Sequence, residues 1–393
     1  MISIFARSDR LTVFDAQLKI TSNKTITRSQ VSTIPHLSVI IPTLNEANTL
    51  PCLLQQLDDQ EDINLEIIVA DGGSCDNTTS IAQRFQNIVF SSERGRAKQL
   101  NAGAYKASYN HLLFLHADSS IEDPKFLSNA FRYFQEQQNL EHQSPNLDKK
   151  PRTPLAGHFP LKFSRSHNNN AKAFRFIEEK TLCNRPQTIN GDQGLLISKE
   201  YFYALGEYDE SMPILEDQRI AKKIFETGKW VVLPGTLTTS GRRFENEGFH
   251  RRYILMSLMM GLYWTNTHEF FIRAREVYPE QSETKKLKLT PFFKAIWLML
   301  AKDLGLRRSI IQWYKVGKYV RENSWQMFFY VDVSRRNSLG PMRYPATEFH
   351  DRFIKPLICN VIFNSMTTVF VFCWYMLILG PVFFILDLFI KDD

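Results

Sequence analysis

The sequence predicts an α/β fold, in which helices cover both faces of a mainly parallel sheet, followed by a helical, membrane-associated region. Short runs of Val, Ile and Leu alternate with helical stretches from Leu37 to about residue 250. Each strand and its helix take about 30 residues, which is typical of parallel sheets. The apolar residues then concentrate towards the C-terminus, where residues 357–390 contain no Lys, Arg, Glu or His.

Composition limits the classes of function. The chain has 393 residues, enough for two domains, and a formal net charge of +7. This charge favours an anionic ligand or an anionic membrane surface. The basic residues are scattered and form no zinc-finger, helix-turn-helix or RNP pattern, so we expect no nucleic acid partner. The five cysteines are widely spaced without a CxxC pair, which indicates reduced thiols rather than a disulfide framework or structural zinc.

The elements of the first half follow from local patterns. Residues 1–36 show no periodicity and no signal-peptide order, so we expect a poorly ordered leader. Apolar, β-branched runs predict four strands at 37–42, 65–70, 88–90 and 112–118. Polar residues that can open a helix follow three of these runs and predict helices over 50–57, 76–85 and 94–107.

The second half continues the alternation. Residues 135–153 are too polar to pack and predict a surface insertion. Further strands are expected at 156–163, 194–198 and 230–234, with helices over 171–182 and from Asp217 onward. The globular domain is therefore expected to occupy residues 37–252.

Three polar clusters follow the expected strands, at 42–46, 71–74 and 116–118. Right-handed crossovers bring the carboxyl ends of parallel strands to one edge of the sheet, where α/β proteins bind ligands. Turn chemistry alone explains one such cluster more readily than three. We therefore expect a ligand site at this edge.

Asp118 follows the apolar run 112–115 directly after His116 and Ala117. A carboxylate at this position can hold a divalent cation, Mg²⁺ or Mn²⁺, which in turn holds a diphosphate. The alternative is that Asp118 starts a turn or caps the next helix.

Seven motifs now stand in a recognisable order: VIIPTLNEANTL, IVADGGSCDNT, RGRAKQLNAGA, LLFLHAD, GDQG, LEDQ and TTSGRRFE. Together they resemble the family 2 glycosyltransferases of GT-A (Rossmann-like) fold, and within them the arsenosugar-biosynthesis-type subgroup. The resemblance covers about Leu37 to Arg252. It implies a sugar transfer from a nucleotide-sugar donor, with UDP as the default nucleotide.

The resemblance also implies roles for individual residues. The nucleotide-sugar donor would be bound by residues of the first four motifs and of the last: Pro42, Asn45, Glu46, Asp71, Gly73, Arg96, Asn101, His116, Ala117, Asp118, Arg242 and Arg243. Asp118 matches the last carboxylate of the family's metal-binding DxD triplet, and His116 departs from that triplet at its first position. Gly191, Asp192 and Gln193 would lie on the acceptor side. Asp217 matches the catalytic base.

The chemistry of sugar transfer from a nucleotide-sugar donor requires similar groups. A departing nucleoside diphosphate gains negative charge, which a metal ion and arginine side chains can neutralise. The attacking hydroxyl must lose its proton, so a carboxylate is needed as general base. Asp217, at the start of an expected helix, suits this role because the helix dipole favours its ionised form. One base without a second nucleophile implies inversion at the anomeric carbon.

Several plainer interpretations stay open from the sequence. Asp217 can be only a helix cap, with Glu216 as the base. Asp192 can be a turn residue, and Arg242 with Arg243 can be a solvated basic face. His158 is more readily a core histidine than a ligand. For the whole chain, the alternatives to a transferase are a catalytically inactive nucleotide-sugar-binding protein and a nucleotidyltransferase.

The C-terminal third predicts membrane association. Residues 253–356 contain short apolar helical stretches next to basic residues, and 357–390 is long enough for at least one transmembrane segment. Gly380 and Pro381 can kink this segment or turn it into a hairpin. Basic residues on its N-terminal side place the catalytic domain on the cytoplasmic face of the cell membrane. The acceptor is then expected to be a small molecule or a lipid-linked molecule at that face.

Overall fold

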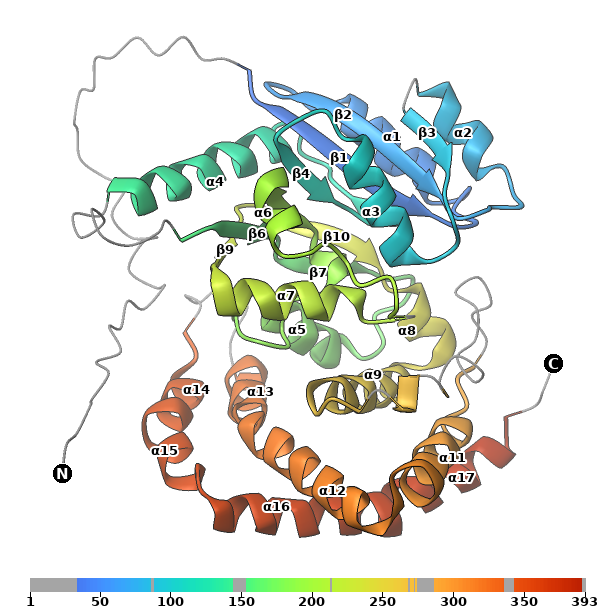
Figure 1. The fold of residues 1–393 in the computed structure, drawn as a ribbon, viewed down its shortest axis with the longest axis vertical. Helices are drawn as coiled ribbons and strands as arrows, with labels where there is room; N and C mark the ends of the chain where they lie inside the picture. The colour runs from blue at the N-terminus through green and yellow to red at the C-terminus, as the bar shows by residue number, and fades with distance from the viewer. Residues whose placement is uncertain are drawn as a thin grey trace. The chain divides into compact units, whose positions relative to one another are not determined.

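A mixed seven-stranded sheet forms the centre of the computed structural model, which describes residues 34–85, 88–143, 153–212, 214–267, 269–271, 273, 286–335 and 343–390. The order of its strands is β3-β2-β1-β4-β8-β6-β9. Four of the neighbouring pairs are parallel, whereas β8 runs antiparallel to β4 and β6. The predicted mainly parallel α/β sheet is therefore confirmed (Figure 1).

The strands lie where the apolar runs predict them. They are β1 His36–Thr43, β2 Asn64–Asp71, β3 Ile88–Ser91, β4 His111–Phe114, β6 Leu155–His158, β8 Leu195–Ser198 and β9 Lys229–Val232. The expected fourth strand is shorter than predicted, because β4 ends at Phe114 and one further ladder bond joins the Leu115 N–H to the Ile40 carbonyl at 3.0 Å. His116 to Asp118 therefore belong to the loop beyond the strand.

Helices cover both faces of this sheet. Side chains alternate along β1, so that Val39 and Ile41 face one side and Ile40 faces the other. Val39 and Ile41 pack with α1 Leu50–Asp58, α2 Thr78–Arg84 and α4 Phe126–Gln143. Ile40 packs with α3 Arg96–Lys106, α6 Lys199–Ala204 and α7 Glu216–Thr227. The two apolar layers fix the sheet edge where the loops meet.

Gly103 sets the distance between α3 and the sheet. A Cβ atom at this position would lie 2.4 Å from Cγ2 of Ile40. A residue larger than glycine would therefore push α3, whose first turn carries Arg96, away from β1.

Two predictions about the second half need correction. Residues 135–143, expected in a polar surface insertion, form the last turns of α4, and 144–152 lie outside the described residues. The expected strand 156–163 is two strands in two sheets. Pro160 stands between them and lacks the N–H that a continuous strand would need.

The second of these strands, β7 Leu161–Ser164, belongs to a three-stranded sheet with β5 Ser119–Ser120 and β10 Leu237–Ser240. Leu161 of β7 and Leu237 of β10 belong to the same apolar core as α4. The predicted leader 1–36 lies outside the described residues up to position 33.

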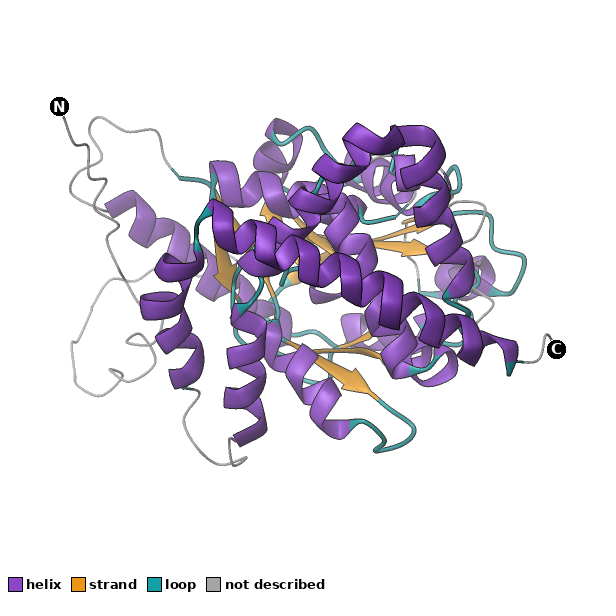
Figure 2. Ribbon diagram, turned by 90° about the horizontal axis from the view of Figure 1, so that it is seen from below, coloured by secondary structure: helices purple, strands orange, loops and turns teal. Residues whose placement is uncertain are grey.

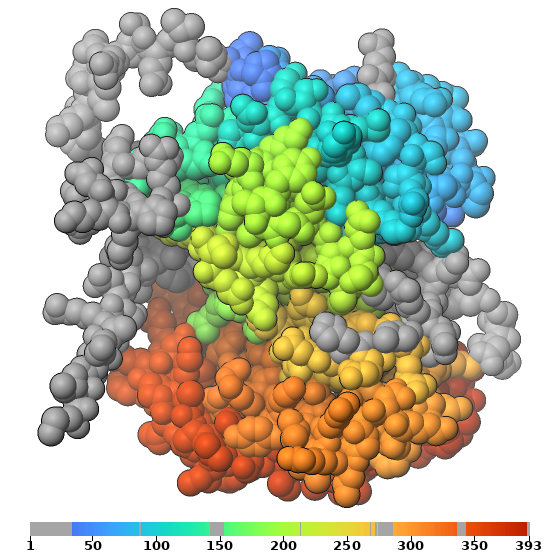
Figure 3. Space-filling model, in the orientation of Figure 1, coloured from blue at the N-terminus to red at the C-terminus, as the bar shows by residue number. Residues whose placement is uncertain are grey.

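Of the remaining helices, α5 Ala171–Lys180 and α8 Arg242–Glu247 pack with β7. The others form a helical layer in the lower part of Figures 1 and 3, away from the large sheet. They are α9 Phe249–Trp264, α11 Thr290–Leu298, α12 Gly305–Glu322, α13 Trp325–Arg335, α14 Pro345–Phe349, α15 Lys355–Ile358, α16 Val361–Trp374 and α17 Gly380–Leu388. A π-helical stretch, Tyr375–Leu379, links α16 to α17.

Together, α16, this π-helical stretch and α17 form one continuous helix, Val361–Leu388. By length and composition, this helix is long and apolar enough to cross a membrane. The alternative of a hairpin at Gly380 is wrong, because the helix runs through Gly380 and Pro381 without reversing. Pro381 is tolerated inside it because the π-helical turn precedes it.

Candidate active site

The first two strand ends are locked together by Asp71. Its carboxylate accepts hydrogen bonds from the Thr43 hydroxyl at 3.0 Å and from the N–H groups of Gly73 and Ser74 at 3.0 and 2.8 Å. Asn45, with a φ of 56°, accepts a bond of 2.9 Å from the Cys75 N–H. The loops after β1 and β2 therefore form one rigid wall, in which Asp71 is buried.

Gln99 on α3 also holds the ends of β1 and β2. Its side-chain amide donates to the carbonyls of Thr43 and Ala70, at 2.7 and 2.8 Å. The buried amide thus satisfies two carbonyls at the ends of β1 and β2. The sequence analysis missed this residue, although it lies in the motif RGRAKQLNAGA.

His116 and Asp192 are in contact across the site, with 2.7 Å between Nδ1 and Oδ1. Burial acts to raise the pKa of Asp192, but the hydrogen bond with His116 and the charges of Arg96 and Arg243 lower it to about 2. Asp192 belongs to the short 3-10 turn Gly191–Gln193, so this pair joins the loop after β4 to the loop before β8.

Asp118, two residues beyond His116, has no hydrogen bond or ion pair with any described residue. Burial raises the pKa of its carboxyl, and although His116 acts to lower that pKa, the nearby charges of Asp192 and Glu46 raise it further. A half-buried, unpartnered carboxylate among other carboxylates is a position that a divalent cation would stabilise.

Asp217 lies in the first turn of α7 and is not the helix cap, because Leu215, with a φ of 63°, occupies that position. Its Oδ2 accepts hydrogen bonds from the Gly191 N–H at 2.6 Å and from the Gln218 side chain at 3.3 Å. Burial, together with the neighbouring charge of Glu216, raises the pKa of the Asp217 carboxyl above its ordinary value.

Two ion pairs bring the arginines to the same edge. Nη1 of Arg96 lies 3.3 Å from Oε1 of Glu216, and Nη2 of Arg242 lies 2.9 Å from Oε1 of Glu46. Both arginines are partly exposed, whereas Glu216 is almost fully buried. Each pair therefore directs a guanidinium group to the solvent-facing side of the site.

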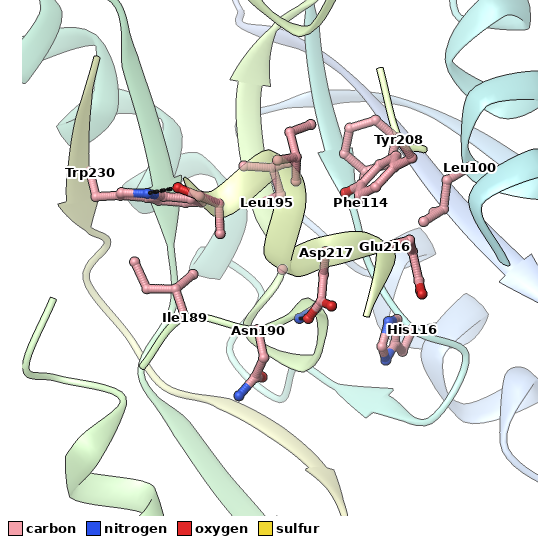
Figure 4. Close-up of a pocket in the computed structure, with 14 residues that line it drawn as sticks. Leu100, Phe114, His116, Ile189, Asn190, Leu195, Tyr208, Glu216, Asp217 and Trp230 are labelled. Atoms are coloured by element: carbon pink, nitrogen blue, oxygen red, sulfur yellow. Dashed lines mark hydrogen bonds between the residues drawn. The ribbon is translucent and has the colours of Figure 1, made fainter. Parts of the chain in front are cut away.

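Figure 4 shows a pocket with His116, Asn190, Glu216 and Asp217 on its polar side. Phe114, Leu195, Tyr208 and Trp230 line the opposite, apolar side. Three segments far apart in the chain contribute these polar groups. Of the three expected strand-end clusters, the one at 116–118 contributes His116 to this pocket, where it lies with Asn190, Gly191 and the start of α7.

Three of the expected site residues and one histidine hold loops together. Asn101 donates to the Tyr208 carbonyl at 2.9 Å and accepts from the Tyr208 N–H at 3.0 Å. Gln193 is buried, with Nε2 3.0 Å from Nδ1 of His158. His158 also packs edge-on against Trp230, and burial lowers its pKa to about 4. The interpretation of His158 as a core histidine is therefore confirmed, and Asp71 is likewise engaged within its own loops.

The donor set limits what metal site this edge can form. Among the described residues, no three His, Cys, Asp or Glu side chains are arranged to enclose a metal ion. Of the carboxylates described at this edge, Asp118 is the one without a hydrogen bond or ion pair. Such a site fits Mg²⁺ or Mn²⁺ held by one or two carboxylates and completed by water and phosphate oxygens.

Two features that the site needs have no clear signal in the sequence. Tyr208 lines the pocket from a loop, and its position depends on contacts with Asn101 more than 100 residues away in the chain. The N–H of Gly191 acts through the backbone, which no residue pattern reveals.

Comparison with known proteins agrees with this geometry. The model of the family described as "Glycosyl transferase family 2" matches residues 38–178, which include β1 to β7. A "PGL/p-HBAD biosynthesis glycosyltransferase" from Mycobacterium bovis is 33% identical over 109 residues, which are 26% of this chain and 43% of that protein. Chondroitin synthase from Escherichia coli is 24% identical over 229 residues, covering 50% of this chain and 33% of its own length.

Among solved structures, residues 1–349 of S. aureus TarS in complex with UDP match with a TM-score of 0.41 and 15% identity. That match covers 73% of this chain and 92% of the TarS chain. The chain thus spans less than half the length of the two curated relatives. None of these matches distinguishes the arsenosugar-biosynthesis-type subgroup, which stays a prediction. The family model thus matches the part of the chain that carries β1 to β7, and residues 179–393 lie outside that match.

Proposed function

We propose that the protein is a glycosyltransferase that moves a sugar from a nucleoside diphosphate sugar to an acceptor hydroxyl, with inversion at the anomeric carbon. The observation that carries the proposal is the position of Asp217. Its carboxylate is fixed by the Gly191 N–H at 2.6 Å and faces the pocket that His116 and Glu216 also line.

The raised pKa of Asp217 supports its role as general base. A carboxylate that binds a proton more readily is better matched to taking one from a hydroxyl near neutral pH. Glu216 is engaged with Arg96, which leaves Asp217 as the base of this pair of carboxylates. No second nucleophile is needed on this path: the hydroxyl attacks the anomeric carbon, its proton passes to Asp217, and the nucleoside diphosphate departs.

The donor's diphosphate is proposed to lie beside Asp118, Arg96 and the arginines at 242 and 243. Asp118 would hold Mg²⁺ or Mn²⁺, which supplies positive charge to neutralise the departing diphosphate. The loops after β1 and β2, with Pro42, Asn45, Asp71 and Gly73, are proposed to receive the nucleoside, with UDP as the default. The rigid hydrogen bonds around Asp71 support this, because a preformed wall loses little entropy on binding.

The acceptor is proposed to be lipid-linked and to be met at the cytoplasmic face of the cell membrane. Two observations support this. The catalytic domain is joined to an apolar helix that is long enough to cross a bilayer. In addition, Met212, Ile214 and Leu215, just before Asp217, pack against the apolar core of the helical layer. The acceptor side of the pocket thus begins next to that layer.

A panel of UDP-, GDP- and ADP-sugars, with and without Mn²⁺, tests the proposal. We expect one donor to raise the melting temperature, because a ligand bound only by the folded state stabilises it. The same donor should release nucleoside diphosphate in the presence of a lipid extract. Binding without release would favour an inactive binding protein, and pyrophosphate release from a nucleoside triphosphate would favour a nucleotidyltransferase.

A further inference from the structure

We propose that the apolar C-terminal helix, Val361–Leu388, lies in the plane of an anionic membrane surface instead of crossing the bilayer. The helical layer would then be a docking face for phospholipid, with the catalytic domain resting on it. This inference concerns the geometry of attachment, and it does not depend on the proposed function.

Exposed apolar side chains are concentrated on this layer. Of the 30 large apolar side chains that are exposed among the described residues, 25 lie between Trp297 and Phe389. On the long helix they include Ile362, Phe370, Leu377 and Leu388, which are 67–73% exposed. Soluble monomers rarely expose contiguous apolar patches of such extent. Figure 2, seen from below, views the molecule from the side where these helices lie.

The opposite side of the long helix is tied to the protein along its length. Its buried residues lie four, seven or eight positions apart, which is one or two helical turns: Asn364, Val371, Tyr375, Leu379 and Asp387. That spacing places them on one stripe of the helix. The stripe packs on α11 and α12, and the apolar face is left on the other side.

Polar contacts fix both ends of this stripe. Asn364 accepts a hydrogen bond of 2.5 Å from Nε of Arg321 on α12. Asp387 pairs with Arg251 on α9 and accepts a bond of 2.7 Å from the Thr290 N–H. If this helix left the protein to span a bilayer, these contacts would break. Asp387 would then be exposed to lipid, and its partner Arg251 would stay buried without a counter-charge.

The neighbouring helix makes spanning still less favourable. α12 runs antiparallel beside α16, since Arg321 meets Asn364 while Trp313 meets Phe372 and Tyr375. α12 carries five basic residues: Arg307, Arg308, Lys315, Lys318 and Arg321. If the pair entered the hydrocarbon together, these charges would enter it as well, which is unfavourable for each of them.

Charge complements the in-plane arrangement. Residues 286–390 contain 14 Lys and Arg against 6 Asp and Glu, a net charge of +8, whereas the rest of the chain has 34 against 35, a net charge of −1. The whole positive charge of the protein therefore belongs to this region. Exposed Arg307 and Arg308 adjoin exposed Leu306 and Ile310, an arrangement typical of interfacial helices on anionic lipid.

Depth measurement on vesicles separates the two geometries. Single cysteines would replace Ile362, Phe370, Leu377 and Leu388 in full-length protein whose exposed cysteines (Cys52, Cys75, Cys359 and Cys373) are changed to Ser. Spin labels on them would be measured with phosphatidylcholine vesicles containing phosphatidylglycerol. A label at exposed Tyr105 on α3 is the aqueous control.

We expect the four labels to lie at one shallow depth, about 5–10 Å below the headgroups. Twenty-six residues separate the outer two labels, about 39 Å along a helix, so a spanning helix would place them on opposite sides of the bilayer with Phe370 and Leu377 deepest. That profile, or labels that stay aqueous, would overturn the proposal.

A charge-reversal pair tests the anionic part. Arg307→Glu with Arg308→Glu should weaken vesicle binding at least tenfold when phosphatidylglycerol is present, because an anionic surface attracts basic side chains and repels acidic ones. Lys125→Glu with Arg132→Glu makes the same change beside α4, far from the helical layer in Figure 1, and should leave binding unchanged. Equal loss in both pairs, or in neither, would contradict the proposed face.

Discussion

The N–H of Gly191 donates a hydrogen bond of 2.6 Å to Oδ2 of Asp217 and so joins the turn before β8 to the first turn of α7. The same turn carries Asp192, which pairs with His116 in the loop after β4. One short turn therefore orients the proposed base relative to the proposed metal-binding loop. The chemistry of the site depends on this turn as much as on the carboxylates.

Glu216→Gln is expected to move the acidic limb of the pH–rate profile to lower pH. Asp217 must be ionised to act as base, so activity falls as the pH drops through its pKa. The charge of Glu216 raises that pKa, and removing it lowers the pKa. The measurement is kcat against pH with saturating donor. Complete loss of turnover with donor binding intact would instead identify Glu216 as the base.

Asp118→Asn is expected to remove the part of nucleotide affinity that depends on metal. Without Asp118, the dissociation constant of the nucleoside diphosphate in Mn²⁺ should rise about tenfold or more, which corresponds to about 1.4 kcal/mol. Titration calorimetry with and without Mn²⁺ measures this difference. Asp58→Asn, at an exposed position at the end of α1, is the matched control. An unchanged Mn²⁺ dependence in Asp118→Asn would place the metal elsewhere.

Asn101→Ala is expected to lower turnover while donor affinity stays within about twofold. Its side chain holds both the N–H and the carbonyl of Tyr208, which lines the apolar side of the pocket. When Tyr208 is held less firmly, the acceptor is positioned less well in the pocket, whereas the nucleotide is unaffected. Loss of the buried hydrogen bonds also lowers the free energy of unfolding by about 1–3 kcal/mol. Separate measurement of kcat and donor affinity checks this. A large loss of donor affinity would support the nucleotide-binding role that the family resemblance implies.

Gly103→Ala is expected to lower the free energy of unfolding by about 1–3 kcal/mol, because the new methyl group would meet Ile40 at 2.4 Å. Gly261→Ala on α9 is the control, since its methyl group would lie at an ordinary 3.6 Å from Tyr319. Alanine is the better helix former, so the control should be neutral or stabilising. Urea unfolding of both variants measures the difference, and equal effects would contradict the close approach of α3 to β1.

The sequence predicts the fold well where patterns are local. Val39 to Ile41 and Ile67 to Val69 are unbroken apolar runs, and both are buried strands. The prediction is wrong in two places. The polar residues 135–143 suggest a surface insertion but form the end of α4, and Pro160 divides the expected strand 156–163 between two sheets.

The site is predictable to a similar degree. The strand-end clusters lie at one edge as the crossover rule requires. The contacts between distant residues, such as Asn101 with Tyr208 and Gly191 with Asp217, have no local pattern, because they depend on how loops pack. The long apolar helix shows the same limit, since composition cannot reveal the polar contacts at Asn364 and Asp387 that tie it to the protein.

The most direct measurement is nucleoside diphosphate release by Asp217→Asn, compared with the unaltered protein, under conditions where the donor raises the melting temperature of both. The account predicts that release falls by about 10²-fold or more, as for loss of a general base, while the donor-induced rise in melting temperature is retained. Release by Asp217→Asn at the rate of the unaltered protein would contradict the assignment of Asp217 as the base.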